Sequence, residues 1–183
     1  SVISLAIIGE RSWSLYGGLV APKSLLPKVR EWLHQDGVNE EMIANLERHS
    51  QLGRIFAAGL RNVSSSREMM KEAIEDAGRA VTHDLERFLT TLGTIASISP
   101  LLGLLGTVIG MVEIFGALTP TGGSPAQLAH GISVALYNTA MGLIVAIPSM
   151  IFYRYFRGKV DALVMEMEQQ SIKLVDMVHG ERK

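Results

Sequence analysis

The chain has 183 residues, a formal net charge of −1 and charged residues at 19% of its positions. This near-neutral balance gives no electrostatic reason to expect nucleic-acid binding. The chain contains no cysteine, which excludes a disulfide framework, a thiolate metal site and a cysteine nucleophile.

The charges are distributed unevenly along the chain. Of the 17 Lys and Arg residues, 11 lie from Arg11 to Arg87 and the other six lie from Arg154 onward. Between Arg87 and Arg154 the only formal charge is Glu113. This long region with a single formal charge predicts an all-α integral membrane protein.

The first residues, Ser1–Ile8, are apolar but too few to cross a bilayer. Two interpretations are open: the tail of a signal anchor, or the last turns of a transmembrane helix that begins upstream. The pair Glu10-Arg11 favours the second interpretation, because charges mark the point where a helix leaves the bilayer. We therefore assign residues 1–9 to the end of a first transmembrane helix.

Residues 10–87 predict a helical insert outside the membrane. Asn39, followed by two glutamates, is typical of a helix N-cap. Ser65-Ser-Arg-Glu68 has the pattern of a capping box. No Gly-Pro breaker follows until Thr119, so we expect one helix of some fifty residues, ~80 Å long, to run from the insert into the membrane.

Two stretches are long enough to span a membrane: residues 88–112 and 131–153 carry no formal charge. The alternative is a pair of buried core helices in a soluble protein. Ser124-Pro125 predicts the start of the second helix. The assigned segments are a second transmembrane helix at 88–118, a periplasmic loop at 119–130, a third transmembrane helix at 131–153 and a cytoplasmic C-terminal helix at 154–183.

Basic residues near the ends of the spans predict their orientation. Arg79 and Arg87 precede the first full span, and Arg154, Arg157 and Lys159 follow the second. The connecting loop has no Lys or Arg, so the positive-inside rule places it outside and both flanks in the cytoplasm. The expected topology is three helices with the N-terminus in the periplasm and the C-terminus in the cytoplasm.

The last span continues into an amphipathic segment. Apolar residues recur at helical spacing after Lys159, while acidic and basic residues fall largely off this stripe. We expect the stripe to pack against other helices; it comprises Val160, Leu163, Met167, Leu174 and Met177, and the charges off it are Glu166, Glu168, Lys173 and Asp176.

Small residues gather on one face of each span. The first span has Gly103, Gly106 and Gly110, and Gly142 lies on a similar face of the second. Small side chains let membrane helices approach closely, so these faces predict assembly into oligomers. Pro100 and Pro148 remove backbone donors inside the spans and are expected to kink both helices.

Polar residues within the spans are the candidates for an ion pathway. Thr107 and Thr139 lie near mid-span on the faces that carry small residues. A hydroxyl in a membrane helix usually bonds to its own backbone, which is the structural alternative for each. Glu113 is a functional candidate because it is an intramembrane acid, although its position near the outer end equally suits a rim or structural role.

The sequence does not support metal binding, cofactor binding or catalysis. The five histidines are scattered and no phosphate-binding loop is present, so we expect no metal, no cofactor and no enzymatic activity.

Three segments resemble the ExbB/TolQ/MotA proton-channel family. The first two are similar to its second and third helices and the last to an element of its cytoplasmic insert; they are Ser99-Pro-Leu-Leu-Gly-Leu-Leu-Gly-Thr-Val-Ile-Gly-Met-Val-Glu-Ile-Phe115, Gly131-Ile-Ser-Val-Ala-Leu-Tyr-Asn-Thr-Ala-Met-Gly-Leu-Ile-Val-Ala-Ile-Pro148 and Ser50-Gln-Leu-Gly-Arg-Ile-Phe56. The position of the insert suits the ExbB and TolQ branch.

The resemblance implies a homopentamer in the bacterial inner membrane. Its central pore would hold the helix of an ExbD/TolR-like single-span protein with a membrane aspartate, and the complex would couple proton flow to a TonB- or TolA-like protein. Thr107 and Thr139 fall on the family's paired pore threonines, and Pro148 on its third-helix proline.

The chain departs from the family at Val134, where many members carry a glutamate. The resemblance therefore implies that the essential acid comes from the partner's aspartate, with Glu113 as a secondary candidate. Two alternatives stay open: a TolQ-like subunit for envelope integrity, and a passive membrane scaffold that does not conduct protons.

Overall fold

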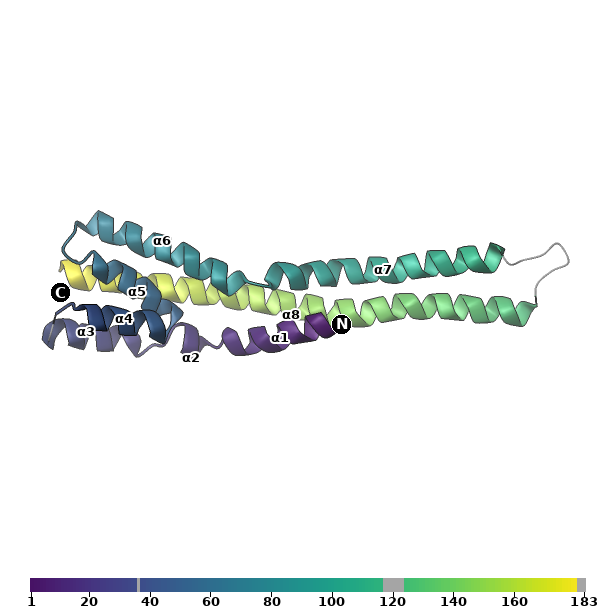
Figure 1. Ribbon diagram of the computed structural model, residues 1–183, viewed down its shortest axis with the longest axis horizontal. Coiled ribbons are helices and arrows are strands. Elements are labelled where there is room, and N and C mark those ends of the chain that lie inside the picture. Colours follow the sequence, from purple (N-terminus) through teal and green to yellow (C-terminus); the bar gives the residue numbers. More distant parts are fainter. Residues whose placement is uncertain (36, 117–123, 181–183) are drawn as a thin grey trace. The chain divides into compact units, whose positions relative to one another are not determined.

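The computed structural model describes residues 1–35, 37–116 and 124–180, and all regular structure in these residues is helical. The all-α prediction is thus confirmed for this part of the chain. Figure 1 shows the eight helices: α1 (Val2–Ser14), α2 (Gly17–Val20), α3 (Leu25–Gln35), α4 (Glu40–His49), α5 (Gln51–Arg61), α6 (Arg67–Glu86), α7 (Leu89–Gly116) and α8 (Pro125–His179).

The chain divides into two compact units. The first comprises Ser1–Gly9 and Phe88–Tyr155, and the second comprises Glu10–Arg87 and Phe156–Lys183. In the first unit, α7 and the first half of α8 lie side by side (Figure 1). In the second unit, α5 packs against both α4 and α6.

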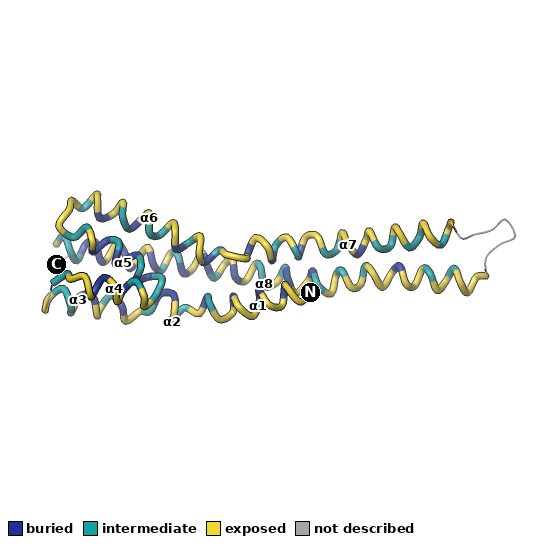
Figure 2. The backbone as a smooth tube through the Cα atoms, in the orientation of Figure 1, coloured by how far each residue is buried: buried dark blue, intermediate teal, exposed yellow. Residues whose placement is uncertain are grey.

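The second unit has a conventional apolar core. Phe56 and Leu60 of α5 are fully buried, as are Met70 of α6 and Val160 of α8. Figure 2 shows the dark buried positions concentrated along these helices. The predicted apolar stripe of the C-terminal segment packs as expected, because Val160, Leu163, Met167 and Leu174 are all buried and Met177 is half-buried.

One of the charges predicted to lie off that stripe is buried. Asp176 is only 6% exposed, and its carboxylate accepts from Arg67 of α6 at 2.8 Å. An ion pair can replace the water that a buried carboxylate loses. The helical pattern predicts that Asp176 lies off the stripe, but it does not reveal this buried ion pair with a partner 109 positions away.

Side-chain caps begin several helices of the second unit. Asn39 accepts from the backbone N–H of Met42 at 2.7 Å, as the sequence predicted. The cap of α6 is Ser66, which accepts from the N–H of Met69 at 3.3 Å. The helix thus starts one residue later than the predicted capping box at Ser65.

The expected continuous helix from the insert into the first full span is interrupted. α6 ends at Glu86 and α7 begins at Leu89. Between them Phe88 has a φ of 63°, a left-handed conformation that a bulky residue rarely adopts. The prediction of one uninterrupted helix was wrong, because no Gly or Pro signals this break in the sequence.

Arg11 of α1 satisfies backbone carbonyls at the end of α6. Its guanidinium donates to the carbonyl oxygen of Leu85 at 3.2 Å and to that of Asp84 at 3.5 Å. The last carbonyls of a helix lack partners of their own, and a cation there also favours the helix dipole. The side chain of Arg11 is only 6% exposed, so this contact is shielded from water.

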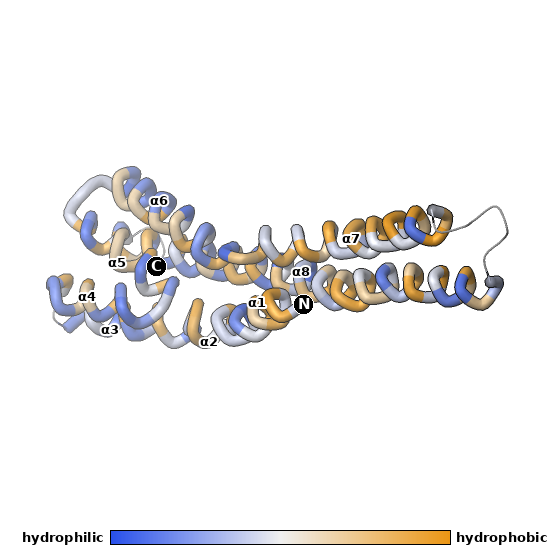
Figure 3. The backbone as a smooth tube through the Cα atoms, turned by 45° about the vertical axis from the view of Figure 1, so that its right-hand side comes forward, coloured by the Kyte–Doolittle hydropathy of each residue, from blue (hydrophilic) through white to orange (hydrophobic). Residues whose placement is uncertain are grey.

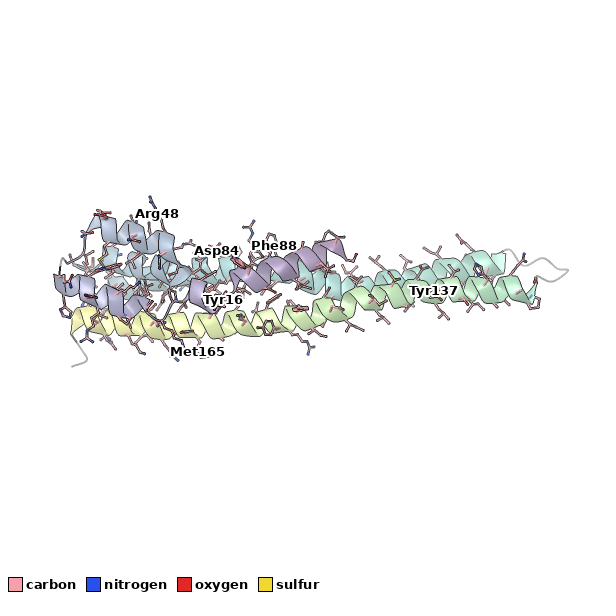
Figure 4. All side chains as sticks on the ribbon, turned by 90° about the horizontal axis from the view of Figure 1, so that it is seen from below. Tyr16, Arg48, Asp84, Phe88, Tyr137 and Met165 are labelled. Atoms are coloured by element: carbon pink, nitrogen blue, oxygen red, sulfur yellow. The ribbon has the colours of Figure 1, made fainter. Side chains whose placement is uncertain are left out.

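Two carboxylates near this junction are held in their ionised form. The hydrogen bond from Arg11 is the main cause that lowers the pKa of Glu10. The hydrogen bond from Arg54, at 2.7 Å, likewise lowers the pKa of Asp84, which Figure 4 labels. Both residues lie in the second unit, outside the uncharged spans.

α8 confirms the predicted continuation of the last span, because it runs through 55 residues without interruption. It begins at Pro125, directly after Ser124, so residues 125–130 of the segment assigned to the loop are helical. The rest of the predicted loop, at 119–123, lies outside the described residues.

We predict that Arg11→Ala lowers the free energy of unfolding by about 1–3 kcal/mol, because buried carbonyls lose their donor. Thermal or denaturant unfolding of the detergent-solubilised protein, followed by circular dichroism, measures this change.

Arg61→Ala is the matched control for Arg11. It also removes an arginine ion pair, with Glu47 at 2.8 Å, but both partners are well exposed. Exposed pairs contribute at most about 1 kcal/mol. Equal stability losses in the two variants would contradict the proposed role of the Arg11 contact.

Candidate functional site

The candidate site lies where α7 and α8 approach each other within the first unit. A Cβ built on Gly142 would lie 2.6 Å from the carbonyl oxygen of Ser99 and 3.2 Å from the Cα of Gly103. A Cβ built on Gly103 would lie 2.8 Å from the carbonyl oxygen of Asn138. No side chain fits at these distances, so the two backbones are in direct contact.

The same close packing extends toward the C-terminal end of α7. Gly106 lies beneath Asn138, where a built Cβ would be 2.9 Å from the asparagine Cβ. A Cβ built on Gly110 would lie 3.3 Å from the Cβ of Ala135. The structure places these glycines between two helices of one chain. The assembly into oligomers that the small-residue faces predict stays a prediction.

Thr139 and Thr107 have different hydrogen-bond partners. The Thr139 hydroxyl donates across the helix contact to the carbonyl oxygen of Gly103, at 3.3 Å. The Thr107 hydroxyl donates to the carbonyl oxygen of Leu104 in its own helix, at 2.6 Å. Thr139 thus lies at the α7–α8 contact, whereas Thr107 follows the common pattern of a hydroxyl bonded to its own backbone.

Pro100 and Pro148 both lie inside helices that continue past them. Each proline lacks an N–H, so the carbonyl four residues earlier loses its helical donor. Such a carbonyl can accept from water or from another chain. The kinks expected at these prolines stay a prediction.

Glu113 lies beside a cavity between the C-terminal part of α7 and the N-terminal part of α8. The cavity has a volume of about 620 Å³ and its polar lining includes Glu113, Gln127 and Asn138. Val134 lines the same cavity. Glu113 and Val134, the position at which the sequence departs from the family pattern, thus line one cavity.

Asn138 lies both at the helix contact and at the cavity, a position that the sequence did not predict. Its side chain covers Gly106, its backbone touches Gly103, and it lines the cavity of Glu113. The available signal was its place directly before Thr139, on a helix that faces a row of glycines. Sequence spacing does not show which glycine row lies opposite.

The outward surface of α7 and α8 is apolar and uncovered. Only 11% of the most apolar window of the Arg67–Gly116 segment and 17% of that of α8 are buried. Figure 3 shows the hydrophobic residues along both helices, and Figure 2 shows that they are exposed. A core helix of a soluble protein would be covered, so this surface fits lipid or protein neighbours in a membrane.

The exposed apolar side chains are long and numerous on both helices. Figure 4 shows them projecting from α7 and α8 and labels Tyr137, which is 71% exposed.

The described residues contain no group of three His, Asp or Glu side chains that could hold a metal ion.

Comparison with known proteins gives a consistent family. The model of the MotA/TolQ/ExbB proton channel family matches residues 47–169, which is more than half of the chain. The Tol-Pal system protein TolQ of Haemophilus influenzae is 33% identical over 179 residues, covering 89% of this chain and 77% of the relative.

Two further relatives are described as ExbB proteins. A protein of Methanothermobacter thermautotrophicus described as an ExbB homologue is 32% identical over 81% of this chain, which spans only 53% of that relative's length. The biopolymer transport protein ExbB of Helicobacter pylori is 45% identical over 85 residues, covering 46% of this chain and 59% of the relative.

We predict that Gly142→Ala destabilises the helix pair by about 1–3 kcal/mol, because the new methyl group collides with backbone atoms that cannot rotate away. Thermal unfolding in detergent measures the effect.

Gly158→Ala serves as the control in the same helix. A Cβ at Gly158 meets nothing within 4 Å, so alanine should leave stability unchanged or raise it. If Gly142→Ala proved as stable as Gly158→Ala, the close backbone contact would be disproved.

Proposed function

Because the chain belongs to the MotA/TolQ/ExbB proton channel family, we propose that it is a proton-channel subunit of an ExbB–ExbD-type motor in the bacterial inner membrane. In this proposal the motor couples the proton-motive force to outer-membrane transport through a TonB-like protein. The observation that carries it is the Thr139 hydroxyl at the α7–α8 contact, within a region whose only formal charge is Glu113.

The subunit supplies a polar wall for the path and its partner supplies the proton carrier. A threonine hydroxyl does not titrate near neutral pH, but it can donate to a carboxylate or support a chain of waters. Glu113 lies one turn from the end of α7, so it suits a place at the entrance. The deep carrier is then the aspartate of an ExbD/TolR-like single-span protein.

The proposed topology has three transmembrane helices. Residues 1–9 end the first, 88–118 form the second and 131–153 form the third, with the N-terminus in the periplasm. Residues 10–87 and 154–183 lie in the cytoplasm, and residues 119–130 connect the second and third helices outside. The basic residues that flank the spans support this orientation.

We propose a pentameric ring around the partner helix. One chain exposes apolar surface on α7 and α8 that other subunits and lipid would cover. Proton entry at 100 mV releases about 2.3 kcal/mol per charge. That energy can favour one of two arrangements of the ring over the other. The coupling requires that a proton crosses only when the partner's aspartate moves from one side of the path to the other.

Two other functions remain candidates. Relatives named TolQ support a subunit for envelope integrity as well as they support a TonB-linked one. A passive scaffold would keep the same helix contacts without conducting protons. The scaffold predicts that collapse of the proton gradient leaves the activity of the complex unchanged.

We predict that Thr139→Val lowers proton flux about tenfold, equivalent to ~1.4 kcal/mol, because the path loses a hydroxyl while the side chain keeps its shape. The measurement uses proteoliposomes that contain the chain with its single-span partner and a pH-sensitive dye.

Thr94→Val is the matched control. The Thr94 hydroxyl donates to the carbonyl oxygen of Thr90 in its own helix at 2.8 Å and is exposed, so its loss should leave flux unchanged. Wild-type flux in a double Thr107→Ala, Thr139→Ala variant would refute the threonine pathway. Wild-type proton flux in a Glu113→Gln variant would show that Glu113 carries no proton and has only a structural role at the entrance of the path.

A further inference from the structure

The cavity beside Glu113 follows one face of α8 for several turns. Its lining on α8 includes Ser124, Gln127, Val134 and Asn138, which recur at the spacing of a single helix face. From Ser124 to Asn138 the helix rises by about 21 Å at 1.5 Å per residue. The hydrocarbon core of a bilayer is about 30 Å thick. A cavity of this length therefore reaches well below the surface of the membrane in which we place the two helices.

Polar side chains lie at both ends of the cavity. Ser124 and Gln127 are at the beginning of α8, and Glu113 is in the last turn of α7. Asn138 lies at the opposite end, next to the helix contact. Among the described residues of the chain, none forms a hydrogen bond with the side-chain amide of Asn138. Lipid tails offer neither donors nor acceptors, so this amide requires water inside the membrane.

The size of the cavity suits water rather than a single bound cation. Its volume of about 620 Å³ equals that of roughly twenty water molecules, at about 30 Å³ each in the liquid. A cation site instead brings several oxygens to within about 2.6 Å of one ion. Gln127 and Asn138 are separated by a rise of about 16 Å along α8, so they cannot ligate the same ion.

The glycine contact closes the cavity just beyond Asn138. A Cβ built on Gly103 would lie 2.8 Å from the carbonyl oxygen of Asn138, and one built on Gly142 would lie 3.2 Å from the Cα of Gly103. Backbones this close leave no room for water between them. The Thr139 hydroxyl, which donates to the carbonyl oxygen of Gly103, lies at this closure. Beyond it, Ala146 is only 5% exposed.

We propose that this cavity is a water-filled half-channel inside each subunit, open toward the outside and closed at the Gly103–Gly142 contact, with Asn138 orienting the water at its closed end. We call it the α7–α8 half-channel. The inference rests on the proposed function and orientation, and it adds the route by which a proton reaches Thr139. Asn138 is a positioning residue, because its amide donates and accepts hydrogen bonds but does not take up a proton.

The closed end gives the half-channel a direction. A proton that enters from outside cannot continue between the two helices, because the glycine backbones touch. It leaves only toward a carboxylate beside Thr139, which the partner supplies. Each subunit then has an entrance of its own, formed by two helices of the same chain.

The absence of cysteine from the chain allows this route to be mapped by labelling. Asn138→Cys is introduced into the full-length chain, which is produced with its partner, and spheroplasts are treated from outside with a membrane-impermeant methanethiosulfonate. The reagent reacts with the thiolate, which forms in water and not in hydrocarbon. Labelling is read from the mass of this chain, so cysteines of the partner do not interfere.

Two matched variants accompany Asn138→Cys. Leu136 lies at nearly the same depth but on the opposite face of α8 and is 63% exposed, whereas Ala146 lies beyond the closure. We expect Asn138→Cys to react at least about tenfold faster than Leu136→Cys or Ala146→Cys, because only the first thiol is in water. Val134→Cys lines the same cavity and carries the same expectation, so the test does not depend on how well one variant folds.

Proton flux in proteoliposomes separates positioning of water from packing. Asn138→Leu keeps the size of the side chain but removes its hydrogen bonds, and should lower flux about tenfold. Asn138→Ser is smaller, yet it keeps a donor and an acceptor and leaves space for another water, so flux should stay within about twofold of wild type. If Asn138 served only to cover Gly106, the order would reverse, because serine leaves a gap there and leucine does not.

Three outcomes would overturn the half-channel. If neither Asn138→Cys nor Val134→Cys reacts faster than Leu136→Cys while wild-type proton flux is retained, the cavity is dry or filled by lipid, and the proposed function still stands. Equal labelling of Ala146→Cys and Asn138→Cys would show that water passes the glycine contact. A flux that requires sodium would make the cavity a cation route. If the wild-type complex carries no protons, the proposed function fails, whereas labelling still decides whether the cavity holds water.

Discussion

The backbone contact between α7 and α8 is the constraint on which the candidate site depends. Gly103 and Gly142 let the two helices touch, and this proximity brings the Thr139 hydroxyl within 3.3 Å of a carbonyl in the other helix. Any larger side chain would push the helices apart and break that hydrogen bond. Between helices that are already in a membrane, the hydrophobic effect does not favour association, because lipid tails are as apolar as the side chains. Close packing of this kind is then a main source of stability for the helix pair.

Such packing also explains why the outer surfaces of α7 and α8 can stay apolar. The residues between the helices are small, so the large side chains point outward and remain uncovered in a single chain. Neighbours in the membrane must cover them. Among the polar groups, Thr139 lies at the helix contact and Glu113, Gln127 and Asn138 line the cavity, whereas the hydroxyls of Thr94 and Thr107 are exposed and bonded within α7.

The second unit is stabilised differently. It has a buried apolar core, side-chain caps at Asn39 and Ser66, and ion pairs such as Arg67–Asp176. At the end of α6, Arg11 bonds the last carbonyls while Phe88 adopts a left-handed backbone. Arg11 thus supplies donors to carbonyls that the end of α6 leaves without helical partners.

The sequence by itself determined the all-helical class, the family, the cap at Asn39 and the uninterrupted α8, because these follow from charge segregation, local propensity and motifs within a short stretch. It did not reveal the break at Phe88, the burial of Asp176 or the position of Asn138 over Gly106. Each of these depends on residues far apart in the chain: Arg11 reaches Leu85, Arg67 reaches Asp176, and one glycine row meets one face of α8. Helical periodicity states which residues share a face, but only the tertiary structure decides what that face meets.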